Sequence, residues 1–117
     1  MYDYFQKTPV DEEYYREHIK GRMPKTIVDA HAHFNLPEHI KNVTAKEVAE
    51  DWALESGMLM PYEDAQAYAT TLLPDLNVRF VCLPWPLKNA DTVGNNQYID
   101  SIVTARGERG LFTNRPE

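Results

Sequence analysis

The chain has 117 residues, 43% of them apolar, which is the size and composition of one ordinary soluble domain. Eighteen acidic against twelve basic residues give a formal net charge of −6, which argues against binding to the phosphate backbone of nucleic acid. No apolar run approaches the ~18 residues of a membrane span, and the first residues do not resemble a secretory signal. A single cysteine, Cys82, excludes an internal disulfide. The sequence therefore predicts a cytoplasmic protein that binds neither nucleic acid nor membrane.

Residues 1–25 are expected to form an N-terminal arm and a helix. Pro9 and the acidic residues after it are typical of the first turn of a helix. Apolar and aromatic residues then recur at helical spacing as far as Ile19, and Gly21 ends the helix. His18 lies on this helix among tyrosines and is interpreted as an ordinary surface or core histidine.

Residues 26–117 contain strands and helices in alternation. Each predicted strand is a run of β-branched and apolar residues, and one helix begins with a capping box at Thr44–Glu47. In chain order the sequence predicts a short buried strand over 26–31, a loop over 35–41, a helix from 44 to about 56, a helix over 61–73, a strand over 78–83, a helix over 96–106 and the start of a strand over 110–113.

The predicted helices carry apolar residues on one side, and Gly107 is expected to cap the last of them. The apolar residues expected on the helix from 44 include Val48, Trp52 and Leu54, and those on the helix over 96–106 are Tyr98, Ile99, Ile102 and Val103. Alternating strands and helices predict an α/β fold with a parallel sheet.

His31 and His33 stand where the first strand ends. Side chains alternate along an extended backbone, so both imidazoles are expected to point to one face of the sheet, together with Asp29. Two imidazoles about 7 Å apart at their Cα atoms can converge on one divalent ion such as zinc. Asp29 would orient a ring or accept from a metal-bound water. The plain alternative is a pair of structural histidines that bind carbonyls or water.

Residues 26–34, Thr-Ile-Val-Asp-Ala-His-Ala-His-Phe, resemble the first-strand signature of the amidohydrolase superfamily, in particular its amidohydrolase-related, metal-dependent hydrolases and decarboxylases. Proteins of this family are (β/α)8 TIM barrels in which both histidines of the signature bind a catalytic divalent metal. The resemblance implies that His31 and His33 are metal ligands. It also implies that residues 26–117 form the first βα units of a barrel, with two to three of its parallel strands.

A complete barrel needs about 250 residues, and the family's sites take further ligands from later strands. We therefore expect this sequence to be the N-terminal part of a metal-dependent hydrolase, inactive by itself, in which a metal-activated water attacks a carbonyl-type small molecule. The same resemblance also admits a decarboxylase or a sugar-acid isomerase. A different interpretation is a small, non-catalytic α/β interaction module, which would form a homo-oligomer to cover its sheet edges.

Four other residues are candidates for specific roles. Trp85, between two prolines after the second strand, is expected to line a substrate pocket, with plain packing as the alternative. His39 is a weaker candidate for a third metal ligand. Cys82 is expected to be a small buried apolar residue, and Arg79 either points into the barrel or pairs with an acid.

Overall fold

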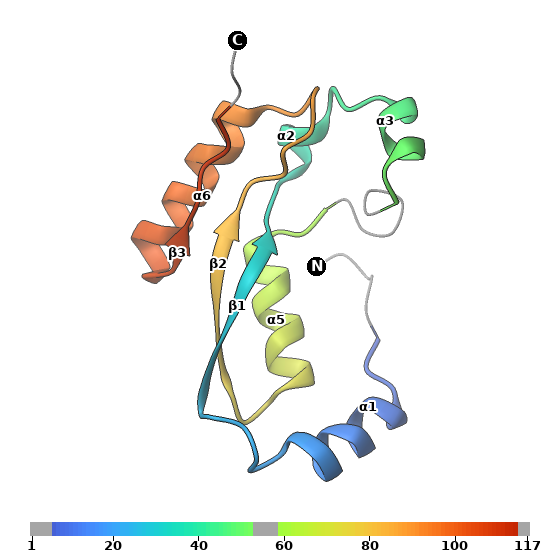
Figure 1. Cartoon of the computed structure of the whole chain (residues 1–117), viewed down its shortest axis with the longest axis vertical. Helices are drawn as coiled ribbons and strands as arrows, with labels where there is room; N and C mark the ends of the chain where they lie inside the picture. Colours follow the sequence, from blue (N-terminus) through green and yellow to red (C-terminus); the bar gives the residue numbers. More distant parts are fainter. Residues whose placement is uncertain (1–5, 53–58, 115–117) are drawn as a thin grey trace.

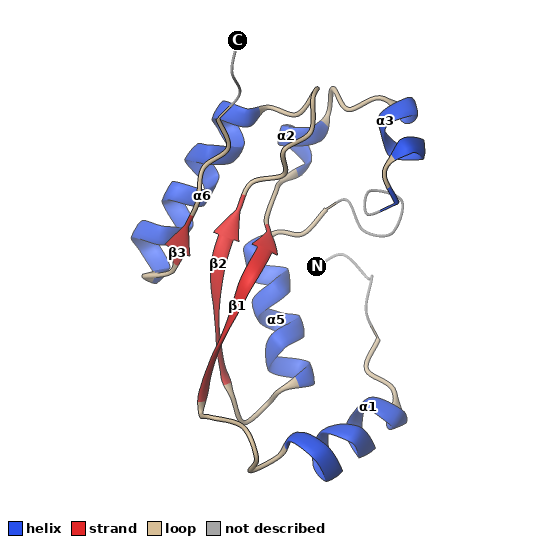
Figure 2. Ribbon diagram, in the orientation of Figure 1, coloured by secondary structure: helices blue, strands red, loops and turns tan. Residues whose placement is uncertain are grey.

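The computed structural model describes residues 6–52 and 59–114, which form a mixed α/β unit (Figures 1 and 2). Its elements in chain order are α1 (Pro9–Tyr14), the π-helical turn η1 (Tyr15–Ile19), β1 (Thr26–His33), α2 (Pro37–Ile40), α3 (Ala45–Glu50), α5 (Tyr62–Leu72), β2 (Asn77–Leu83), α6 (Thr92–Arg106) and β3 (Arg109–Gly110).

The three strands form one parallel sheet in the order β1-β2-β3, as the alternation of elements predicts. Helix α5 connects β1 to β2, and α6 connects β2 to β3, so the sheet is built from two consecutive βαβ units. Because parallel strands run in the same direction, their carboxyl ends lie at one end of the sheet (Figure 2). The segments that follow the strands therefore meet there.

The core lies between one face of the sheet and the two connecting helices. Its buried apolar side chains come from α5, β2, α6 and the residue after β1, and they are Tyr62, Phe80, Cys82, Ile99, Ile102 and Phe34. The expected apolar side of the last helix is therefore confirmed. Phe34 packs edge-on against both Tyr62 and Phe80, with ring centroids 5.5 and 5.3 Å away.

Helix α6 begins four residues earlier than the sequence predicts. The carboxylate of Asp91 accepts from the Gly94 amide at 2.9 Å and so caps the helix before Thr92. The helix ends as predicted at Gly107, which has a φ of +67°. The glycine at 110 is needed for another reason: a Cβ there would lie 2.8 Å from methyl groups of Ile99 and Val103.

Strand β1 is longer and more exposed than predicted. It continues to His33, and most of its residues are exposed, with Val28 at 61%. The prediction of a buried strand is wrong because β1 is at the edge of the sheet, and α5 and α6 pack on the face opposite to Val28.

Two further expectations differ from the structure between the first strand and α5. The predicted loop over 35–41 contains the short helix α2, which has Pro37 in its first turn and the imidazole of His39 accepting from the Leu36 amide. Helix α3 has the predicted capping box but ends at Glu50, and Trp52 is 80% exposed. The predicted end of that helix near residues 56–57, and Leu54, lie outside the described residues.

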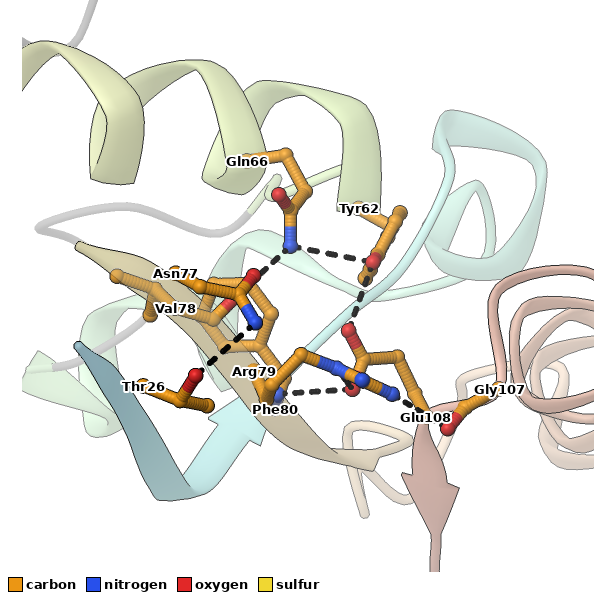
Figure 3. A network of polar contacts seen from close by, with 9 residues as sticks. All are labelled: Thr26, Tyr62, Gln66, Asn77, Val78, Arg79, Phe80, Gly107 and Glu108. Carbon is orange, nitrogen blue, oxygen red and sulfur yellow. Dashed lines mark hydrogen bonds and ion pairs between the residues drawn. The ribbon is translucent and has the colours of Figure 1, made fainter. Parts of the chain in front are cut away.

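One buried carboxylate, in the turn between α6 and β3, joins β2 to α5. Glu108, 2% exposed, accepts from the Tyr62 hydroxyl at 2.9 Å, from Arg79 Nε at 2.9 Å and from the Phe80 amide at 3.1 Å (Figure 3). Arg79 therefore pairs with an acid, and it also donates to the Gly107 carbonyl. Gln66 extends the network by donating to the Tyr62 hydroxyl.

We predict that Glu108→Ala lowers the free energy of unfolding by about 2–3 kcal/mol, because it leaves three donors without their acceptor. Urea denaturation measures the loss. Glu108→Gln keeps one acceptor oxygen and is expected to lose less. Glu50→Ala, which removes an exposed pair with Lys46, should change the value by under about 0.5 kcal/mol. Equal losses for Glu108→Ala and Glu50→Ala would contradict the assignment.

Candidate functional site

The imidazoles of His31 and His33 lie next to each other at the carboxyl end of β1. Their Nε2 atoms are 3.0 Å apart, and their ring centroids are 4.9 Å apart. His31 is exposed and His33 is half-buried. The two side chains therefore lie side by side at the strand end, as the His-x-His spacing predicts.

The backbone after β2 sets the tautomer of His33. Its Nδ1 lies 2.9 Å from the carbonyl oxygen of Pro84, and a carbonyl can only accept. Nδ1 therefore carries a proton, and in the neutral form of the ring the lone pair of Nε2 faces His31. The proton between the two Nε2 atoms then belongs to His31. A metal-ligating histidine is held in the same way, with one nitrogen donating to the protein and the other left for the metal.

The histidine pair fits part of a metal site. Two nitrogens on one tetrahedral zinc lie about 3.3 Å apart, given bonds of about 2.05 Å, so the observed 3.0 Å needs an adjustment of a few tenths of an ångström. Over residues 6–52 and 59–114, however, no group of three or more His, Cys, Asp or Glu side chains is arranged to hold a metal. This part of the chain therefore brings two imidazole nitrogens together without a third His, Cys, Asp or Glu placed to complete a site.

Asp29 departs from the alternation on which its prediction rests. Asp29 pairs with Phe80 and Ala32 with Cys82, so three steps along β1 match two along β2, and a bulge interrupts the strand. Asp29 pairs with the buried Phe80 and lies on the same face of the sheet as that residue. His33 pairs with Leu83 and lies on the opposite face. Its carboxylate accepts from the His31 amide at 3.0 Å. Asp29 thus contacts the backbone of the histidine segment.

Trp85 lies against His33 and borders an open groove. The two ring centroids are 4.9 Å apart. The groove has a volume of about 340 Å³. It lies beside the end of β1 and is bordered by the loop that follows β2 and by α5. It is lined mainly by aromatic residues, together with Asp29 and His33; the aromatic ones are Phe34, Tyr68, Phe80 and Trp85. An apolar molecule in this groove would touch Trp85 and lie beside the imidazole of His33.

The other two histidines are not part of this cluster. His39 is 5% exposed; its Nδ1 accepts from the Leu36 amide at 3.0 Å, and its ring lies 5.7 Å from that of Tyr98. Burial lowers the pKa of His39 below its ordinary value, which favours the neutral ring that this hydrogen bond requires. His18 lies against Tyr14, with ring centroids 4.7 Å apart. Neither histidine joins the pair on β1 within the part of the chain described.

Cys82 is buried in the core, as expected. Burial, with a smaller contribution from the nearby carboxylate of Glu108, raises the pKa of its thiol to about 12. A thiol that stays protonated at neutral pH is a poor nucleophile and a poor metal ligand. Cys82 therefore acts here as a packing residue.

Sequence reasoning missed Asn95 and the Pro84 carbonyl. Asn95 is four residues before Ile99 and seven before Ile102, so it extends the apolar side of α6 toward its first turn. A polar residue at that spacing was the available signal of a buried amide. The role of the Pro84 carbonyl depends on the pairing of β1 with β2 and has no signal in the local sequence.

Comparisons of the chain with protein-family models, with curated proteins and with solved structures give no match. Among the described residues no helix is long and apolar enough to cross a membrane. The arrangement of the side chains is therefore the basis for a functional hypothesis.

The buried ring of His39 predicts a pH dependence of stability. Its pKa is lower in the folded chain than the ordinary 6.5, so below that pH the unfolded chain binds more protons. The stabilisation by neutral His39 is complete above about pH 6.5 and is lost as the pH falls through the folded pKa. The unfolding free energy of the wild type should therefore fall more steeply between about pH 7.5 and 5 than that of His39→Asn, by up to about 1.4 kcal/mol per pH unit. Parallel urea-derived curves for the two proteins would refute this.

Proposed function

We propose that this chain is the N-terminal part of a metal-dependent hydrolase of the amidohydrolase type, in which His31 and His33 are two ligands of a divalent metal, most simply zinc. One observation carries the proposal. Two imidazole Nε2 atoms lie 3.0 Å apart at the carboxyl end of a parallel strand, and the tautomer of one ring is set by the Pro84 carbonyl. This combination is typical of metal-binding histidines.

The position of the pair in the fold supports an enzyme. Ligands of parallel α/β folds bind beyond the carboxyl ends of the strands, where loops from several strands bring side chains together. His33 and Trp85 come from the ends of neighbouring strands and touch each other there. The proposed enzyme is cytoplasmic and acts on a small molecule, with the apolar part of that molecule in the groove beside Trp85.

The uncovered face and edges of the sheet support the first units of a (β/α)8 barrel. Helices α5 and α6 cover one face, whereas Val28 on the other face is 61% exposed. Leu111 and Phe112 after β3 are exposed as well. In a barrel the inner face is covered by the other strands, and no strand has a free edge. Further strands would also carry the missing ligands and the general base.

The histidines and the groove have separate roles in this proposal. His31 and His33 would hold the metal, which when bound would lower the pKa of a water and polarise the substrate carbonyl. His33 keeps its Nδ1 proton on Pro84 and so offers only Nε2 to the metal. Trp85 and the aromatic groove bind and orient the substrate next to the metal ligands and exclude water from its apolar part.

We predict that the chain binds zinc weakly, with a Kd above about 1 µM, because two protein ligands leave the coordination open. Titration with zinc alone, followed by the ¹⁵N signals of the imidazoles, should shift Nε2 of His31 and His33 together. His31→Ala/His33→Ala should abolish the response. His18→Ala is the matched control and should bind like the wild type, because His18 lies on η1 and stacks with Tyr14 instead of joining the pair.

Two results would contradict the proposal. Zinc that binds equally well to the double variant would place the metal elsewhere, and no binding at millimolar zinc would favour the structural or interaction role. Tight stoichiometric zinc lost in the double variant would instead indicate a complete local site and refute the expectation of a partial one. Ester or amide turnover by this chain alone, in proportion to purified protein, would refute it too.

A further inference from the structure

Asn95 is a buried amide that contacts the segments following two different strands. Its side chain, on the first turn of α6, is 1% exposed. The Nδ2 atom donates to the Phe34 carbonyl at 2.8 Å, and the Oδ1 atom accepts from the Trp85 amide at 3.0 Å. Phe34 directly follows His33, and Trp85 directly follows Pro84. Asn95 is therefore one residue away from each partner of the His33–Pro84 hydrogen bond.

This arrangement fixes the distance between the two loops. The ladder between β1 and β2 ends with the Phe34 amide donating to the Leu83 carbonyl at 2.9 Å. Beyond that point the two segments have no regular pairing, and the amide of Asn95 bridges them. Only a side chain that donates and accepts at the same time can do so. Next to the bridge, the Pro84 carbonyl lies within hydrogen-bond distance of His33 Nδ1, and the ring of Trp85 lies against that of His33.

The neighbouring residue makes the same kind of bridge away from the histidines. Asn96 Nδ2 donates to the Thr113 carbonyl at 2.9 Å, and its Oδ1 accepts from the Thr113 amide at 3.0 Å. Asn96 thus attaches the segment after β3 to the same turn of α6. Two consecutive asparagines hold the segments that follow all three strands, but only Asn95 contacts those beside His33.

We propose that Asn95 is a positioning residue for the metal site: by bridging Phe34 and Trp85 it holds the Pro84 carbonyl on His33 and so fixes the tautomer that offers Nε2 to a metal. The part of this inference that concerns the metal rests on the proposed function. The part that concerns the tautomer does not, since it describes the metal-free protein.

The experiment compares Asn95→Ala with Asn96→Ala, which removes two hydrogen bonds of the same kind, to Thr113 instead of Phe34 and Trp85, from the same helical turn. Long-range ¹H–¹⁵N spectra at about pH 8.5, well above the ordinary histidine pKa of about 6.5, report which ring nitrogen carries the proton. In the wild type and in Asn96→Ala we expect His33 to be protonated on Nδ1. In Asn95→Ala we expect a mixture of tautomers. Zinc affinity should fall about 10-fold or more in Asn95→Ala, the usual effect of removing such a support, and by less than about 2-fold in Asn96→Ala.

Asn95→Leu is the second variant, in case Asn95→Ala does not fold. It fills the space of the amide but can neither donate nor accept, so we expect the same mixture of tautomers and the same loss of zinc affinity as in Asn95→Ala. Backbone amide shifts of β2 identify the folded variants. An unchanged His33 tautomer in a folded Asn95 variant overturns the inference, as does equal weakening of zinc binding by Asn95→Ala and Asn96→Ala. If the wild type binds no zinc but the tautomer changes only in the Asn95 variants, the positioning role stands and the proposed function fails.

Discussion

The parallel pairing of β1 with β2 is the constraint on which the candidate site depends. It brings the residues after both strands to one end of the sheet, so that His33 meets the Pro84 carbonyl and the ring of Trp85. Neither contact follows from the His-x-His spacing, because both partners lie about fifty residues later in the chain. An antiparallel pairing would put the segment after β2 at the opposite end of the sheet and leave His33 without this support.

The features that the sequence predicted correctly depend on local periodicity. The proximity of the two histidines needs only alternation over three residues, and the apolar side of α6 needs only helical spacing. The prediction for Asp29 assumed that alternation continues over five residues, and the bulge after Asp29 breaks it. The exposure of β1 was not predictable from its composition, because a run of β-branched residues looks the same in a central strand and at an edge.

Glu108 and Asn95 show why the buried polar groups were beyond sequence reasoning. Each is recognisable only through partners on other elements: Tyr62 and Arg79 for the carboxylate, Phe34 and Trp85 for the amide. A buried polar group without partners costs about 1–3 kcal/mol, so each of these side chains stabilises one arrangement of the loops and helices over its competitors. Apolar packing alone tolerates small shifts between elements, whereas a hydrogen bond does not.

This difference between apolar and polar contacts affects how firmly the proposed metal site is held at the end of the sheet. Without hydrogen bonds, two imidazoles on an exposed strand end would sample several rotamers. Only the fraction of molecules with both rings in the right rotamer could bind a metal. The Pro84 carbonyl limits that freedom for His33, and it lies in a loop that the side chain of Asn95 links to the segment after β1. The imidazole of His31 lies against that of His33, and the backbone amide of His31 donates to the carboxylate of Asp29. Asn95 on α6 therefore positions the two loops, the loop after β2 positions the ring of His33, and His33 in turn positions His31.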